Sequence, residues 1–123
     1  MYTDIKQSEN FANNLRAKIK LARQEAVLQQ ATLRLVITDK EYGFQKLKKG
    51  EKSYFWDWLP AHSILKKTAL KKEVLIEKNQ SIEFYPNGRF SIFSIILSDP
   101  QKKASIIIMG DENGEIGVNK IEK

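Results

Sequence analysis

"LRAKIKLARQEAVLQQATLRLVITDKEYGFQKL" occupies residues 15–47, and the spacing of its apolar residues changes partway along. Before Ala31 they recur at intervals of three and four, the period of one helix face. After Ala31 they alternate or run together in short stretches, as they do in strands. The stretch therefore predicts a helix that passes directly into a β-sheet region.

The N-terminal helix is predicted from about Ser8 to Ala31, with Ser8 as its N-cap. It contains neither proline nor glycine, and about 23 residues of helix would be roughly 35 Å long. The residues expected to pack this helix on the sheet are Phe11, Leu15, Ile19, Ala22 and Ala26. A second, narrower apolar strip is formed by Ala17, Leu21 and Leu28. This strip serves either for further packing within the domain or for contact with a partner.

The remainder of the chain is predicted to be antiparallel sheet. Residues 32–38 and 42–47 form a hairpin around "DKE", and later strands are expected at 81–85, 90–98, 104–110 and 115–121. We predict one α+β domain: a helix in residues 1–31, laid on about six to eight strands of a β region in residues 32–123. Residues 52–67 are the least regular part, and their aromatic run is either core or an exposed recognition patch: Tyr54, Phe55, Trp56 and Trp58.

Composition excludes several kinds of chemistry. The 123 residues include no cysteine, so there is no disulfide, thiolate metal site or cysteine nucleophile. The single histidine, His62, precedes Ser63, but adjacency in sequence does not aim a base at a nucleophile. No glycine-rich phosphate motif is present. We therefore predict a protein that is not an enzyme, with no catalytic residues, no cofactor and no small-molecule substrate.

"GDENGEIGVNKIE" (110–122) has the oxygen spacing of a helix-loop-helix calcium loop from Asp111 to Glu122. Such a loop needs glycine at its sixth position and helices on both sides, whereas Ile116 stands there and the flanks are strand-like. Asn113 and Gly114 instead predict a tight type I′ hairpin turn. No metal site is predicted.

The net charge of +6 is concentrated in the middle of the chain. Residues 32–79 carry +5 and residues 80–123 carry −1. A candidate anion or DNA patch consists of Lys46, Lys48, Lys49, Lys52, Lys66, Lys67, Lys71 and Lys72. Lysine pairs of this kind also occur as ordinary solvated surface.

Three elements, in this order, resemble the H-type minor pseudopilins of type II secretion and the related minor type IV pilins (the GspH/FimT pilin family). The first is an "AR-x-EA" helix running into a strand and an aromatic hairpin; its matching positions are Ala22, Arg23, Glu25, Ala26, Leu33, Leu35 to Ile37, Tyr42 and Phe44. The second is an "I-x-F-x-P-x-G" turn, matched by Ile82, Phe84, Pro86 and Gly88. The third is a "G-D-x-x-G-x-I" hairpin, matched by Gly110, Asp111, Gly114 and Ile116.

The resemblance implies a pilin-like fold and a role in assembly. Members of that family carry a leader and an apolar membrane segment ahead of this region, so we expect the sequence to be the soluble part of a longer chain. The implied protein is a minor pseudopilin near the pseudopilus tip, taking part in export of folded proteins across the outer membrane. Its globular domain would lie in the periplasm of a Gram-negative bacterium, anchored in the inner membrane through that segment alone. The implied partners are other major and minor pseudopilins.

Two alternatives remain. A minor type IV pilin could bind DNA during uptake through the lysines, although DNA-binding relatives carry arginine-rich C-terminal loops and Arg89 is the only arginine in residues 80–123. A stand-alone ligand-binding or enzymatic domain could build its site from residues distant in sequence.

Overall fold

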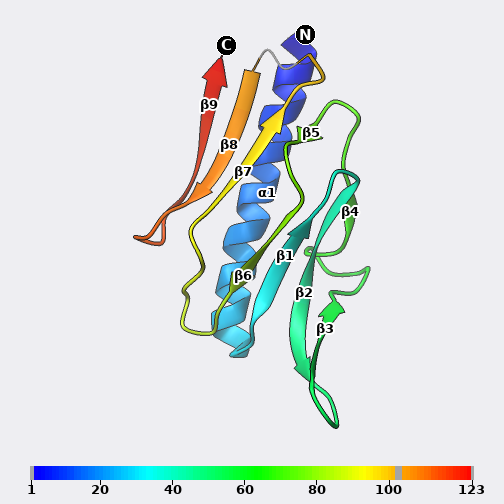
Figure 1. The fold of residues 1–123 in the computed structure, drawn as a ribbon, viewed down its shortest axis with the longest axis vertical. Helices are drawn as coiled ribbons and strands as arrows, with labels where there is room; N and C mark the ends of the chain where they lie inside the picture. Colours follow the sequence, from blue (N-terminus) through cyan, green and yellow to red (C-terminus); the bar gives the residue numbers. More distant parts are fainter. Residues whose placement is uncertain (1, 102–103, 123) are drawn as a thin grey trace.

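A computed structural model describes residues 2–101 and 104–122 of the chain (Figure 1). The described residues form one long helix followed by nine strands. The helix is α1 (Tyr2–Gln29), and the strands are β1 (Leu33–Ile37), β2 (Glu41–Lys49), β3 (Tyr54–Trp58), β4 (Thr68–Ala69), β5 (Leu75–Ile76), β6 (Gln80–Phe84), β7 (Phe93–Ser98), β8 (Ala104–Gly110) and β9 (Ile116–Glu122).

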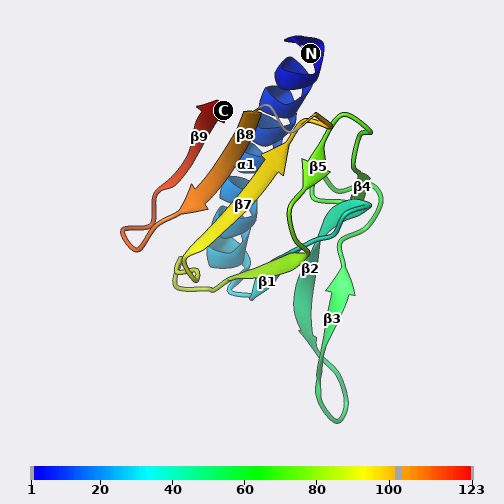
Figure 2. The same ribbon diagram turned by 45° about the horizontal axis from the view of Figure 1, so that its top comes forward.

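The strands form two antiparallel sheets. The first has the order β3-β2-β1-β6, with the short β4 also paired to β2. The second has the order β5-β7-β8-β9. The two sheets lie side by side in front of α1 (Figure 2), so one helix covers both.

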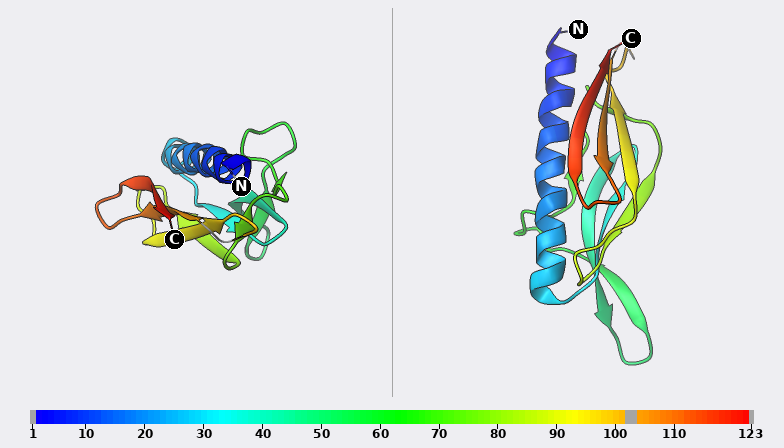
Figure 3. Two further views of the ribbon diagram at one scale, coloured as in Figure 1. Left: turned by 90° about the horizontal axis from the view of Figure 1, so that it is seen from above. Right: turned by 90° about the vertical axis from the view of Figure 1, so that its left-hand side faces the viewer.

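The core lies between α1 and the sheets, which form two layers when the molecule is seen from above or from the side (Figure 3). In β1, Leu33, Leu35 and Ile37 are buried while the residues between them are half-buried, which is the alternation of a strand with one face on the core. In the second sheet, the fully buried residues of β7 and β8 are Ile95, Leu97, Ile106 and Ile108. The predicted hairpin of residues 32–47 is present as β1 and β2, with Leu35 opposite Phe44.

The predicted start of the helix was wrong. Helix α1 already includes Tyr2, and Ser8 lies inside it, 2% exposed, with no hydrogen-bond partner for its hydroxyl among the described residues. The apolar period shows where a helix packs and not where it begins. With no proline or glycine in residues 2–29, nothing stops the helix from continuing toward the N-terminus.

The C-terminal end of α1 is closed by a Schellman motif. Gln30 adopts φ +50°, the Ala31 amide donates to the Ala26 carbonyl at 3.0 Å, and the Gln30 amide donates to Val27 at 3.2 Å. The helix therefore ends at Gln29, slightly earlier than predicted, and the chain turns into β1 over a few residues.

Two strand predictions also needed correction. Phe90 makes only an isolated bridge with Phe84, and β7 begins at Phe93, so residues 90–98 are not one strand. The two-residue strands β4 and β5 raise the count in the described residues above the predicted six to eight. A strand of two residues is too short to show a recognisable hydrophobic period in the sequence.

The aromatic run belongs to a hairpin and not to the core. Strands β2 and β3 continue past the end of α1 as a two-stranded ribbon (Figures 1 and 3). Tyr54 is 65% exposed, Phe55 48% and Trp58 36%.

Candidate functional site

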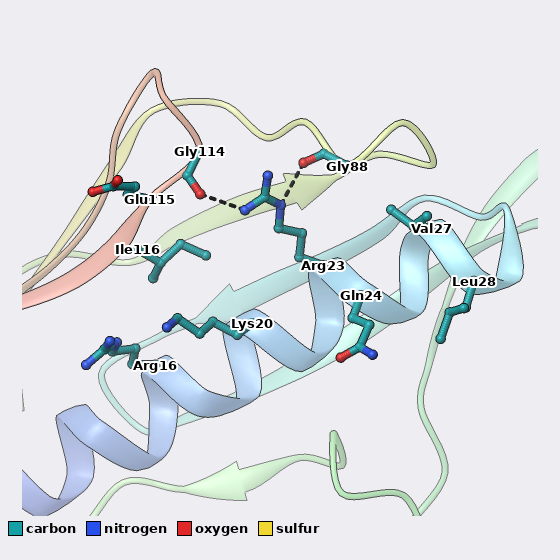
Figure 4. Close-up of a pocket in the computed structure, with 10 residues that line it drawn as sticks. All are labelled: Arg16, Lys20, Arg23, Gln24, Val27, Leu28, Gly88, Gly114, Glu115 and Ile116. Atoms are coloured by element: carbon teal, nitrogen blue, oxygen red, sulfur yellow. Dashed lines mark hydrogen bonds between the residues drawn. The ribbon is translucent and has the colours of Figure 1, made fainter.

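Arg23 on α1 ties together two turns that are far away in sequence. Its Nε donates to the Gly88 carbonyl at 2.7 Å, and its Nη1 donates to the Gly114 carbonyl at 2.6 Å (Figure 4). Its guanidinium carbon also lies 5.0 Å from the centre of the Phe90 ring. One side chain therefore fixes the helix, the turn after β6 and the β8–β9 turn relative to one another.

The two turns share a backbone geometry. In the first, the Tyr85 amide donates to Arg89 and the Gly88 amide donates back to Tyr85, both at 2.9 Å. In the second, the Asp111 amide donates to Glu115 at 3.0 Å and the Gly114 amide to Asp111 at 3.1 Å. Each glycine has φ +84°, which favours glycine. Arg23 thus binds equivalent carbonyls in two equivalent turns.

The hairpin predicted around Asn113 and Gly114 is present, but its turn type was wrong. A type I′ turn needs positive φ at both residues, and only Gly114 has it. The Asp111 carboxylate accepts from the Asn113 amide at 2.9 Å and from the Glu115 amide at 3.0 Å. These bonds hold a type I turn followed by a left-handed glycine, the usual three-residue hairpin loop.

Arg23, Gly88 and Gly114 come from the three separate elements on which the family resemblance was based. Sequence reasoning singled out all three positions but gave Arg23 no role. The sequence does not show which acceptors a positively charged side chain on a helix will bond. The fold brings the carbonyls of Gly88 and Gly114 within reach of Arg23.

A groove of about 720 Å³ runs along this flank of α1. Arg16, Lys20, Arg23 and Val27 succeed one another at spacings of three and four, so they stand in one row on the helix. The β8–β9 turn forms the opposite wall with Gly114, Glu115 and Ile116 (Figure 4). Three cations and one carboxylate line the groove, and Arg16 Nε has no hydrogen-bond partner among the described residues. The groove suits a ligand with both acidic and apolar groups.

A smaller groove of about 420 Å³ lies on another flank of α1. The helix contributes Leu21, Glu25 and Gln29, and the segment after β3 contributes residues that include Leu59 and Ile64. Ile64 is 68% exposed. Helix α1 therefore borders a hollow on each of two flanks.

The residues predicted to pack the helix on the sheet are all in the core. Their exposed fractions are Phe11 9%, Leu15 0%, Ile19 0%, Ala22 0% and Ala26 0%. The strip predicted to lie off that face is mostly outside the core, with Ala17 exposed, Leu28 68% exposed, and Leu21 half-buried against the core.

The eight lysines of the predicted anion patch do not form one surface. Three have partners: Lys46 donates to Gln29 at 3.0 Å, Lys48 pairs with Asp57 at 2.8 Å, and the Lys67 ammonium lies 4.2 Å from the Trp58 ring centre. Lys49 and Lys52 lie at the end of the β2–β3 hairpin, and the remaining exposed lysines are Lys66, Lys71 and Lys72. The segment joining β4 to β5 lies toward the other end of the molecule (Figure 1).

The pKa of Glu9 is lowered from its ordinary value of 4.5, mainly by a hydrogen bond from Lys120; burial opposes this shift, and the charges of Lys120 and Lys6 add to the lowering. His62 is exposed. Within residues 2–101 and 104–122, no three His, Cys, Asp or Glu side chains gather in a way that could hold a metal ion. In the same ranges no helix is long and apolar enough to cross a membrane.

Two solved structures share this fold. Both are described as the minor pseudopilin EpsH from the type II secretion system of Vibrio cholerae. One matches with a TM-score of 0.77 and 16% identity over 91% of this chain and 95% of that chain. The other matches with a TM-score of 0.75 and 14% identity over 96% of each chain. The predicted α+β, pilin-like fold is confirmed.

A search of curated proteins found no match. The sequence model of one family, described as "Type II transport protein GspH", matches residues 12–114. The match takes in α1 from Ala12 onward, strands β1 to β8, and the two glycines, Gly88 and Gly114, whose carbonyls Arg23 binds. This chain belongs to the GspH family of type II transport proteins.

Proposed function

We propose that this protein is a minor pseudopilin, a structural subunit near the tip of the type II secretion pseudopilus that takes part in exporting folded proteins across the outer membrane. The observation that carries the proposal is the GspH match over residues 12–114. The fold shared with EpsH, which is itself named a minor pseudopilin, supports it. The work of such a subunit is assembly and not catalysis.

In this proposal the globular domain lies in the periplasm, and an apolar segment ahead of α1 anchors it in the inner membrane. The orientation of α1 supports this arrangement, because its N-terminal end lies at one extremity of the molecule (Figure 3). A membrane segment could continue the helix from there without disturbing either sheet.

The proposed contacts with other pseudopilins lie on the outer side of α1. Ala17, Leu21 and Leu28 are spaced at four and seven residues, so they share a stripe. Leu28 is 68% exposed and Val27 40%, and both also line the larger groove. Exposed aliphatic groups beside the cations Arg16 and Lys20 would suit a neighbouring subunit that presents apolar and acidic side chains.

DNA binding is the second candidate function. One observation favours it: Lys49 lies opposite Tyr54, whose ring is exposed, and Lys52 precedes Tyr54 by two residues. Rings combined with cations bind single-stranded nucleic acid. The partners of Lys46, Lys48 and Lys67 weigh against a continuous phosphate-binding surface.

Deletion of the gene in its source bacterium tests the proposal. We expect proteins that use the type II pathway to accumulate in the periplasm of the deletion strain, while DNA uptake is unchanged. Complementation with the wild-type gene should restore export. Normal export in the deletion strain would refute the proposal, and a loss of DNA uptake alone would establish the second candidate.

A further inference from the structure

The far end of the β2–β3 hairpin, residues 47–56, is here called the arm. Its turn is closed by the Gly50 amide, which donates to the Ser53 carbonyl at 2.8 Å. Among the described strands, β3 lies at a sheet edge and pairs with β2 alone. The arm extends beyond the C-terminal end of α1, at the opposite extremity from both chain ends (Figures 1 and 3).

The base of the hairpin is held firmly. The Arg34 guanidinium carbon lies 4.1 Å from the Trp56 ring centre, and Arg34 Nε donates to Gln45 Oε1. The Lys67 ammonium covers Trp58 at 4.2 Å. A Cβ on Gly43 would come within 3.0 Å of both Lys67 and Trp58, so this glycine lets them pack closely. These contacts fix the direction of the arm, so less conformational entropy is lost when the arm binds a partner.

The aromatic side chains at the end of the arm, by contrast, are not part of the core of their own domain. Tyr54 and Phe55 are neighbours in a strand, so their rings point to opposite faces, and they are 65% and 48% exposed. A two-stranded ribbon is marginal by itself, and the exposed parts of these rings remove no apolar surface from water on folding. Tyrosine rings in exposed positions are typical anchors of protein interfaces.

The charge of the arm points to an acidic partner. Lys49 and Lys52 are exposed and have no ion pair in the part of the chain that the structure describes, whereas Lys48 is paired with Asp57. Glu51 is the one acidic residue within the arm. The complementary surface would carry carboxylates around an apolar hollow that admits a ring.

We propose that the arm docks onto an acidic surface of the neighbouring pseudopilin on the side away from the inner membrane. This inference rests on the proposed function, in which the membrane segment precedes α1. The arm then points away from the lipid and along the filament, so a lipid headgroup is out of its reach. The Tyr54 ring would fill the hollow, and Lys49 and Lys52 would pair with the carboxylates around it.

The test is binding of this domain to the purified soluble domains of the major and other minor pseudopilins of the same system, measured by calorimetry at low and physiological salt. One arm variant combines Tyr54→Ser with Phe55→Ser, and its control is Leu75→Ser, since Leu75 is 38% exposed on β5. The other combines Lys49→Glu with Lys52→Glu, and its control combines Lys71→Glu with Lys72→Glu. All positions are at least a third exposed, so the variants should fold, which thermal unfolding checks.

We expect each arm variant to weaken binding to one of these domains by about tenfold or more and the controls to leave it unchanged. Normal binding by both arm variants, together with loss of binding by Leu28→Asp, would overturn the arm inference and leave the proposed function standing. No binding of the wild type to any pseudopilin domain would count against both. Arm variants that lose only affinity for a DNA strand at physiological salt would overturn the inference in favour of nucleic acid.

Discussion

Arg23 Nη1 and the Gly114 carbonyl oxygen are 2.6 Å apart, although 91 residues separate them in the chain. The same guanidinium also bonds the Gly88 carbonyl. The turn after β6 and the β8–β9 turn are therefore both attached to α1 at Arg23. The larger groove is built around this connection. Both the stability of the domain and the shape of the groove are therefore expected to depend on Arg23.

Replacing Arg23 tests that dependence. Arg23→Met removes both hydrogen bonds and should lower the free energy of unfolding by about 1–3 kcal/mol. Arg23→Lys should be less damaging, because one ammonium can reach only one of the two carbonyls. Urea denaturation measures the loss, and faster hydrogen exchange of the Gly88 and Gly114 amides would locate it. Lys20→Met on the same flank is the control; an equal loss there would contradict the assignment.

Substitution of Gly114, Gly88 and Gly117 by alanine should lower stability to decreasing extents, with no loss at Gly117. Gly114→Ala introduces a Cβ in a left-handed conformation and within 2.9 Å of Arg23 Nη2, so it should cost at least about 1 kcal/mol. Gly88→Ala meets only Val27 at 3.6 Å and should show the backbone strain alone. Gly117→Ala meets no atom of the described residues within 4 Å and should be neutral or slightly stabilising. Thermal unfolding of the three variants would reveal any other order.

The helix end offers a stabilising substitution. Gln30 has φ +50°, a conformation that glycine adopts without strain, so Gln30→Gly should stabilise the domain by about 0.5–1 kcal/mol. The loss of the exposed Gln30 hydrogen bond to Val27 offsets part of this gain. Gln29→Gly, one residue earlier and within α1, should destabilise by about 1 kcal/mol. If both substitutions changed the free energy of unfolding in the same direction, the Schellman motif would not govern the helix end.

Leucines on opposite sides of α1 should differ sharply. Leu15 is fully buried, and Leu15→Ala should cost about 2–5 kcal/mol. Leu28 is 68% exposed, and Leu28→Ala should change stability by less than about 0.5 kcal/mol. Chemical denaturation of the isolated domain gives both values. A large loss for Leu28→Ala would mean that the outer strip serves the fold and is not free for a partner.

The Glu9–Lys120 ion pair should contribute a small, pH-dependent stability. The atoms Glu9 Oε1 and Lys120 Nζ are 2.8 Å apart, and both side chains are more than a third exposed, so screening keeps the coupling below about 1 kcal/mol. Because the pKa of Glu9 is lowered on folding, the contribution is present above pH 4.5 and is lost as the pH falls through the lowered value. A double-mutant cycle with Glu9→Gln and Lys120→Met at neutral and acidic pH measures it. Coupling that persists after Glu9 is protonated would contradict this account.

Much of the architecture was predictable from local patterns. The change of hydrophobic period near Ala31 located the passage from helix to sheet, and the alternation in residues 32–47 located the first hairpin. Periods carry this information because burial on one face imposes the same spacing on every helix or strand. The boundaries at Ser8 and Phe90 were missed because burial, not hydrogen bonding, produces the period.

The sequence by itself determined an α+β domain, its helix-to-sheet order and the residues that line its core, because each follows from interactions between neighbours in the chain. Only the tertiary structure decided that Arg23 would join Gly88 to Gly114. It also decided that some of the eight lysines would have partners within the domain, and that Tyr54 and Phe55 would be exposed on an arm. These depend on distances between residues far apart in sequence. No local period encodes such distances, since they arise when two sheets and one helix pack together.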